Sequence, residues 1–83
     1  MILSSYPKID LHGFDREYAV YKVDEFILDN IKSKNYTVVI IHGIGDGILR
    51  KAVHEYLRKN KSVESFQVDV INTGTTIVKI KEI

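Results

Sequence analysis

The sequence contains no cysteine and no long apolar run, and its charges almost cancel. Without cysteine, the chain can form neither a disulfide framework nor a thiolate metal cage. It has no stretch of about eighteen apolar residues, so we expect no transmembrane helix. The N-terminal Met-Ile-Leu-Ser-Ser lacks the charged start and the long apolar segment of a secretory signal. We therefore expect a cytoplasmic protein with no membrane partner, stabilised by its core alone.

Positive charge is concentrated in the middle third of the chain. The 83 residues allow a single domain, and the net charge of +1 does not by itself indicate a nucleic-acid binder. Residues 32–62, however, carry seven Lys or Arg and only two Asp or Glu. A phosphate backbone would be attracted to this segment. A solvated basic surface explains the same distribution, so charge leaves both interpretations open.

The first half of the chain predicts a short strand and a helix. Residues 1–8 show no clear period, and we expect them to form an N-terminal arm. Ile9 and Leu11 alternate with Asp10 and His12, which indicates a strand with one buried face. A helix is predicted over residues 15–31, capped by Asp15. Its apolar stripe recurs at steps of three and four residues: Ala19, Val20, Val23, Phe26, Ile27 and Ile31.

The second half predicts a buried strand, a helix and a hairpin. Residues 37–41 are an unbroken β-branched run, typical of a parallel strand inside a sheet. A helix over residues 48–59 follows. Strands over residues 63–71 and 76–83 form an antiparallel hairpin, with Val70 pointing inward. We therefore expect an α/β domain of order β-α-β-α-β-β, a two-layer sandwich with a mixed sheet whose strand order the pattern leaves open.

Two of the predicted strands end in the same dipeptide. His12-Gly13 and His42-Gly43 lie thirty residues apart, one βα unit. If both strands are parallel, both histidines lie at the carboxyl edge of the sheet, where open α/β sheets bind ligands. Asp10 shares a strand face with His12 through its i, i+2 spacing. The sequence thus predicts a site in which Asp10 and the two histidines converge.

A glycine-rich turn adjoins this predicted site. Gly43, Gly45 and Gly47 permit backbone conformations closed to other residues and let a ligand come close. The helix that follows presents unpaired N–H groups, which favour a phosphate, and Arg50 can add a forked donor pair. A tight strand-to-helix turn capped by Asp46 accounts for the same glycines.

These segments resemble the motifs of the Smr (small MutS-related) domain family, named from the C-terminal part of the MutS2 proteins. Residues 9–13, Ile-Asp-Leu-His-Gly, are similar to the Leu-Asp-Leu-His-Gly motif that opens the domain. Residues 42–50 match the family signature His-Gly-x-Gly-x-Gly-x-Leu-Arg at every fixed position. Residues 74–78 resemble its third, glycine-containing segment. The resemblance runs over residues 9–83, which it implies form the Smr domain.

The resemblance implies a fold like the C-terminal half of translation initiation factor three. It also implies DNA or RNA as partner, with endonuclease activity on structured or branched substrates. The family's Asp-x-His motif, tied to cleavage, falls on the catalytic candidates Asp10 and His12. The substrate-binding candidates are His42, Gly43, Gly45, Gly47 and Arg50. A divalent cation such as magnesium is the candidate cofactor, and its ligands are unknown.

The chain departs from the family pattern at Ile44, where a basic residue is common, and at Asp46, which adds an acid. These departures motivate an alternative, a non-catalytic module that binds nucleic acid or ribosomes. Asp10 has two candidate roles, orienting His12 or holding the cation, besides a structural hydrogen bond. His42 could instead fix the glycine turn through its ring nitrogens. A zinc site and a homodimer through an edge strand are further options.

Overall fold

The computed structural model describes residues 5–82, and the expected order of elements is confirmed. The elements are β1 (Lys8–Asp10), α1 (Arg16–Lys32), β2 (Thr37–Ile41), α2 (Ile48–Lys59), β3 (Val63–Val68) and β4 (Thr75–Ile80). Residues 1–4, half of the expected N-terminal arm, lie outside the described residues, and Lys8 already belongs to β1. None of the helices within residues 5–82 has the length and apolarity needed to cross a membrane.

The long helix α1 begins and ends at residues with clear local causes. The Asp15 carboxylate accepts a hydrogen bond from the Tyr18 amide at 2.8 Å, so the expected cap is confirmed. At the other end, Lys34 takes a left-handed conformation with φ of 61°, and its amide donates to the Ile31 carbonyl. This conformation turns the chain out of the helix and into β2.

The four strands form one mixed sheet in the order β1-β2-β4-β3. β1 and β2 are parallel, as expected, and β4 runs antiparallel to both of its neighbours, β2 and β3. The β-branched strand β2 is internal, which confirms the prediction from its unbroken apolar run. Because β4 reverses direction, the carboxyl ends of β1, β2 and β3 lie at the same edge of the sheet. The β3–β4 loop therefore also starts from that edge.

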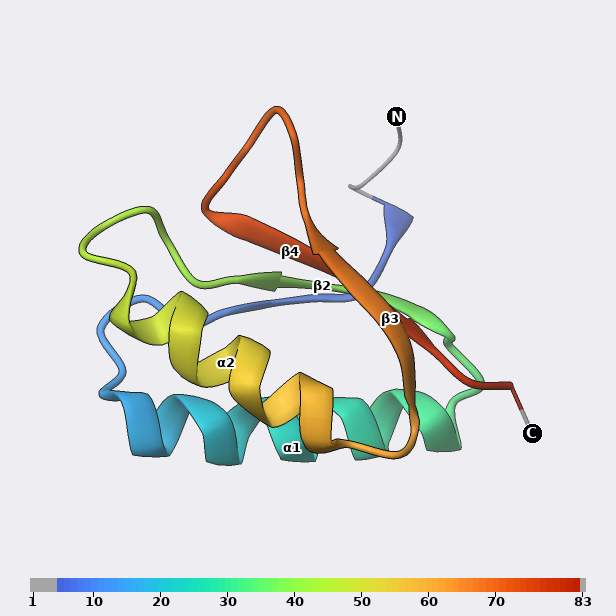
Figure 1. Cartoon of the computed structure of the whole chain (residues 1–83). Helices are drawn as coiled ribbons and strands as arrows, with labels where there is room; N and C mark the ends of the chain where they lie inside the picture. Colours follow the sequence, from blue (N-terminus) through green and yellow to red (C-terminus); the bar gives the residue numbers. More distant parts are fainter. Residues whose placement is uncertain (1–4, 83) are drawn as a thin grey trace.

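Both helices pack on one face of the sheet and form the second layer (Figure 1). The core lies between the layers. Its buried residues come from both helices, from β2 and β4, and from the residue after β1, and partly buried residues of β3 pack against them. Its buried members are Leu11, Ala19, Val23, Ile27, Val38, Ile40, Val53, Leu57, Val78 and Ile80. Val78 and Ile80 of β4 thus point into the core.

The expected end of the third strand was wrong. We expected residues 63–71 to be extended with Val70 inward, but β3 ends at Val68, and the Val70 side chain is 89% exposed. β4 begins at Thr75, whose carbonyl accepts the Asp69 amide, and no further residue of β4 is available to pair. The Asp69 carboxylate then accepts the Ile71 amide and turns the chain away from the sheet. The last strand is likewise shorter than the expected residues 76–83.

Candidate functional site

The carboxyl edge of the sheet brings together three segments that are distant in the sequence. Asp10, Ile41 and Thr75 form one row across β1, β2 and β4. One residue further on, the Leu11 amide donates to the Ile41 carbonyl, and the His42 amide donates to the Gly74 carbonyl, both at 2.9 Å. The two His-Gly dipeptides therefore emerge side by side, as their spacing predicted.

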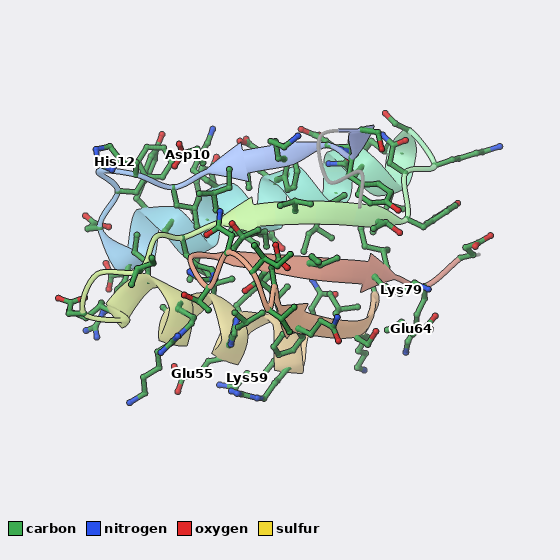
Figure 2. All side chains as sticks on the ribbon, turned by 90° about the horizontal axis from the view of Figure 1, so that it is seen from above. Asp10, His12, Glu55, Lys59, Glu64 and Lys79 are labelled. Atoms are coloured by element: carbon green, nitrogen blue, oxygen red, sulfur yellow. The ribbon has the colours of Figure 1, made fainter. Side chains whose placement is uncertain are left out.

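Asp10 and His12 lie where the outer strand β1 reaches this edge, and both are exposed. Figure 2 shows them next to each other at the carboxyl end of β1. β1 ends at Asp10, so His12 lies in a turn and not in the expected strand. The Asp10 Oδ1 atom accepts the backbone amide of His12 at 2.9 Å. This hydrogen bond fixes the turn that carries the His12 ring, while Leu11 between them is buried in the core.

Glycine is needed within the glycine loop, residues 43–47, and at Gly74 beside it, for two different physical reasons. Gly43 and Gly47 both have φ of 84°, in the left-handed region that disfavours side chains. Gly74, in contrast, is needed for close approach, because a methyl group there would lie 3.1 Å from the Gly43 carbonyl carbon. The Gly74 carbonyl also accepts both the His42 and the Gly43 amides. The loop is therefore attached to the β3–β4 connection, a contact that the sequence pattern did not reveal.

A cleft of about 330 Å³ lies between the glycine loop, the His12-Gly13 turn and the start of α2. Arg50, in the first turn of α2, lines it together with His12. Gly47 caps α2 without a side-chain hydrogen bond, and the Asp46 carboxylate accepts the Ile48 amide at 3.1 Å. The next two amides have no helical carbonyl to pair with, so they remain free to meet an anion. Ile44 also lines the cleft and is 69% exposed.

The His42 ring points into the protein, and only 6% of the residue is exposed. Its Nδ1 atom lies 3.0 Å from the Gly43 carbonyl oxygen, and its Nε2 atom lies 2.7 Å from the Thr76 hydroxyl. Burial lowers the pKa of His42; the contact with the Gly43 carbonyl opposes this shift, and the Arg50 guanidinium adds to it. Both ring nitrogens therefore have partners within the fold.

A second histidine, His54 on α2, reaches the same hydroxyl. Its Nε2 atom lies 2.8 Å from Thr76 Oγ1, and its ring packs against Phe66 of β3. Burial lowers the pKa of His54, and His42, Arg58 and Arg50 lower it further. The sequence pattern did not reveal this contact, because it depends on β4 lying beside β2.

The described part of the chain shows no ready-made metal cage. Within residues 5–82, no three His, Cys, Asp or Glu side chains are grouped so that they could hold a metal ion. His42 turns inward to Thr76, whereas Asp10 and His12 face solvent. The zinc site considered from these three residues is therefore not assembled in this structure.

The chain is similar to known proteins in both sequence and fold. The Smr domain family model matches residues 9–81. Two relatives are named Endonuclease MutS2: that of Brevibacillus brevis is 40% identical over 76 residues, and that of Streptococcus gordonii is 43% identical over 77 residues. These matches cover 88% and 89% of this chain but only 10% of each relative. The chain thus spans about a tenth of the length of the curated relatives.

Two solved structures have the same fold. The Smr domain of Thermus thermophilus MutS2 is 32% identical, with a TM-score of 0.88, over 90% of this chain and 98% of that domain. YdaL, a stand-alone small MutS-related protein from Escherichia coli, is 22% identical, with a TM-score of 0.87, over 94% of this chain and 69% of YdaL. The expected α/β fold with a mixed sheet is confirmed.

Proposed function

The chain belongs to the Smr domain family, and from this premise we propose that it binds DNA or RNA through the glycine-loop cleft and hydrolyses a phosphodiester bond there. Residues 9–83 are the working domain in this proposal. The observation that carries the proposal is the presence of exposed His12, Arg50 and the free end of α2 around one cleft. The relatives named Endonuclease MutS2 support the choice of reaction.

The cleft suits a phosphate because it combines three kinds of anion attraction. The left-handed glycines allow the backbone to approach a ligand without intervening side chains. The first amides of α2 and its positive dipole end point at the cleft. The Arg50 guanidinium adds a planar pair of donors that matches two phosphate oxygens. In the proposal these groups bind the phosphodiester and stabilise the charge that develops as water attacks it.

His12 is the proposed general base and acid. A neutral imidazole takes a proton from the attacking water, and the resulting imidazolium returns a proton to the departing sugar oxygen. Asp10 fixes the turn that carries His12 through the 2.9 Å bond to the His12 amide. Its exposed carboxylate also suits a divalent cation such as magnesium, which commonly uses one or two carboxylates together with substrate phosphates. Such an ion would supply charge neutralisation at the phosphate.

A second candidate function is binding without cleavage, and two features of the loop favour it. Ile44 presents an apolar side chain to the cleft, and Asp46 brings a negative charge close to the proposed phosphate position. Asp10 contacts the His12 backbone and not its ring, so the bond does not itself align the imidazole. In this case the cleft docks on structured RNA, ribosomes or DNA without turnover.

A cleavage panel separates the two candidates. Purified protein is incubated with single-stranded, duplex and branched DNA and RNA, in buffers with Mg²⁺, Mn²⁺ or EDTA. Hydrolysis predicts cleavage that is lost in His12→Ala and reduced in Asp10→Asn. Asp29→Asn, which removes an exposed carboxylate on α1, is the matched control and keeps full activity. Absence of cleavage on every substrate, or full activity in both cleft variants, rejects the hydrolytic proposal.

Binding is measured on the same substrates by fluorescence anisotropy at several salt concentrations. Arg50→Ala weakens binding and reduces its salt dependence, because one phosphate contact is lost. Lys61→Ala removes the same charge just beyond the opposite end of α2, a twelve-residue helix about 18 Å long, and leaves affinity close to the original. Binding that Arg50→Ala weakens, in the absence of any turnover, supports the second candidate. Equal effects of the two variants reject the cleft as the binding site.

A further inference from the structure

One buried hydroxyl is shared by two histidine rings. Thr76 of β4 has no exposed surface, and its Oγ1 atom lies 2.7 Å from His42 Nε2 and 2.8 Å from His54 Nε2. The two rings are nearly perpendicular, with centroids 5.8 Å apart. These contacts join the residue that follows β2 to β4 and α2, immediately before the glycine loop. Neither His54 nor Thr76 lies among the cleft-lining residues, so the proposed reaction does not use them.

The donors and acceptors of this cluster can be assigned by counting protons. The Gly43 oxygen is a carbonyl and can only accept, so His42 must carry its proton on Nδ1. The Nε2 atom of a neutral His42 is then an acceptor, and the Thr76 hydroxyl must donate to it. The same hydroxyl oxygen accepts from His54, whose proton therefore lies on Nε2. The two histidines hold opposite tautomers.

A positive charge on His42 disturbs this order. If His42 gained a second proton, both rings would donate to Thr76, and the buried hydroxyl proton would lose its acceptor. The nearby charged groups also favour neutral rings, because Arg50 and Arg58 of α2 repel a positive charge on the histidines. Phe66 of β3, which packs against the His54 ring, carries no charge. The cluster is therefore neutral at neutral pH, and its hydrogen bonds have one direction.

We propose that Thr76 and His54 are positioning residues that hold the glycine loop in its binding geometry through His42. The hydrogen bonds run from His54 to Thr76, from Thr76 to His42, and from His42 to the Gly43 carbonyl at the first residue of the loop. This fixes the Gly43 peptide, from which the rest of the cleft wall continues. The inference rests on the proposed function for its purpose, but its geometry stands without a ligand.

Imidazole nitrogen NMR tests the proton assignment directly. Long-range ¹H–¹⁵N spectra at pH 7.5 report which nitrogen of each ring carries a proton. We expect His42 to be protonated on Nδ1 and His54 on Nε2, both rings neutral. The same tautomer in both rings, or a charged ring at this pH, overturns the proposal. No nucleic acid is involved, so failure of the proposed cleavage cannot affect this result.

Amide hydrogen exchange tests the positioning role. Thr76→Val keeps the side-chain shape without the hydroxyl, and Thr76→Ser keeps the hydroxyl. We expect exchange in residues 43–47 to be about tenfold faster in Thr76→Val, as for loss of one buried hydrogen bond, and the serine variant to restore it. Exchange in α1 serves as reference. An equal increase in α1 and in the loop, or no increase in the loop, contradicts a positioning role.

A second pair of variants covers the case in which Thr76→Val does not fold. His54→Gln supplies an N–H donor to the same hydroxyl, whereas His54→Leu supplies none. Loop exchange is expected to be faster in the leucine variant only, and to rise below pH 6.5 in the wild type as the rings gain protons. A labelled oligonucleotide binds about tenfold more weakly to His54→Leu than to His54→Gln, for the same lost bond. Equal affinity and equal exchange in this pair overturn the proposal.

Discussion

Replacing Gly74 with alanine forces a methyl group against the attachment point of the glycine loop. That methyl carbon would lie 3.1 Å from the Gly43 carbonyl carbon and 3.2 Å from both the Gly43 Cα and the Ile44 amide nitrogen. The optimal separation between non-bonded carbon atoms is about 3.5–4.0 Å, so the two carbon contacts are too close, and the contact with the Ile44 nitrogen is equally tight. The Gly43 and His42 amides are both bound to the Gly74 carbonyl at 2.9 Å. The loop therefore cannot move away without stretching these bonds.

The cost of Gly74→Ala follows from two opposing terms. Overpacking against backbone costs about 1–3 kcal/mol. Gly74 is not among the positive-φ residues, so alanine fits its backbone and recovers about 0.4–1 kcal/mol from the unfolded state. The net loss of unfolding free energy is about 1 kcal/mol, which lowers Tm by about 4–8 °C in a domain of this size.

Thermal melts by circular dichroism and amide NMR spectra measure the effect of this substitution. The matched control is Gly13→Ala, where φ is 82° and no atom lies within 4 Å of the added methyl group. Both variants lose stability, the control through backbone strain of about 1 kcal/mol. Only Gly74→Ala shifts the amide signals of Gly43 and Ile44. A Gly74→Ala protein that melts at or above the wild-type temperature with these signals unmoved refutes the reasoning.

Three other perturbations have outcomes fixed by local structure. Lys34→Gly removes the strain of a left-handed lysine and raises the unfolding free energy by about 0.5–1 kcal/mol, measured by urea denaturation. Because the fold lowers the pKa values of His42 and His54, the unfolded chain binds more protons, so the unfolding free energy is highest above pH 6.5 and falls with decreasing pH in urea titrations. Tyr56→Phe deletes the hydroxyl that donates to the Asp24 carboxylate across α1 and α2, and lowers Tm by an amount equivalent to about 1 kcal/mol.

Each of these expectations has a clear contrary result. A less stable Lys34→Gly protein would show that the left-handed lysine carries no strain. Lys32→Gly, at the last residue of α1, is the control that must lose stability. An unfolding free energy that rises as the pH is lowered from 6.5 to 5 would contradict neutral histidines in the fold. The His54→Gln protein is the reference, because it lacks one of the two histidines and its unfolding free energy should depend less on pH. An unchanged Tm in Tyr56→Phe would show that the phenol contributes only through its ring.

Local signals were sufficient where one segment determines its own structure. The β-branched run of β2 needs burial on both faces, and Asp15 can satisfy a free amide of α1 wherever the helix packs. The inward position predicted for Val70 was wrong because the apolar alternation of the sequence continues past the last residue that β4 can pair with. The alternation of a strand specifies its faces, but the length of a strand is set by its neighbour.

The site divides in the same way. The Asp10 and His12 turn and the glycine loop were found from motifs and from the rule that parallel strands share a carboxyl edge. His54 and Thr76 were missed because they are 22 residues apart and meet only when β4 inserts between β2 and β3. The periodicity could not supply the strand order, and the inner contacts of the site depend on that order.

The central place of β4 also governs when the molecule can fold during synthesis. β2 and β3 have no sheet partner in common until residues 75–80 leave the ribosome, because β4 lies between them. The glycine loop likewise waits for Gly74, which immediately precedes this strand. A nascent chain that extends only from β1 to α2 therefore holds the first two motifs, residues 9–13 and 42–50, without the cleft. The cleft is therefore completed only when β4 joins the sheet, in a single late step.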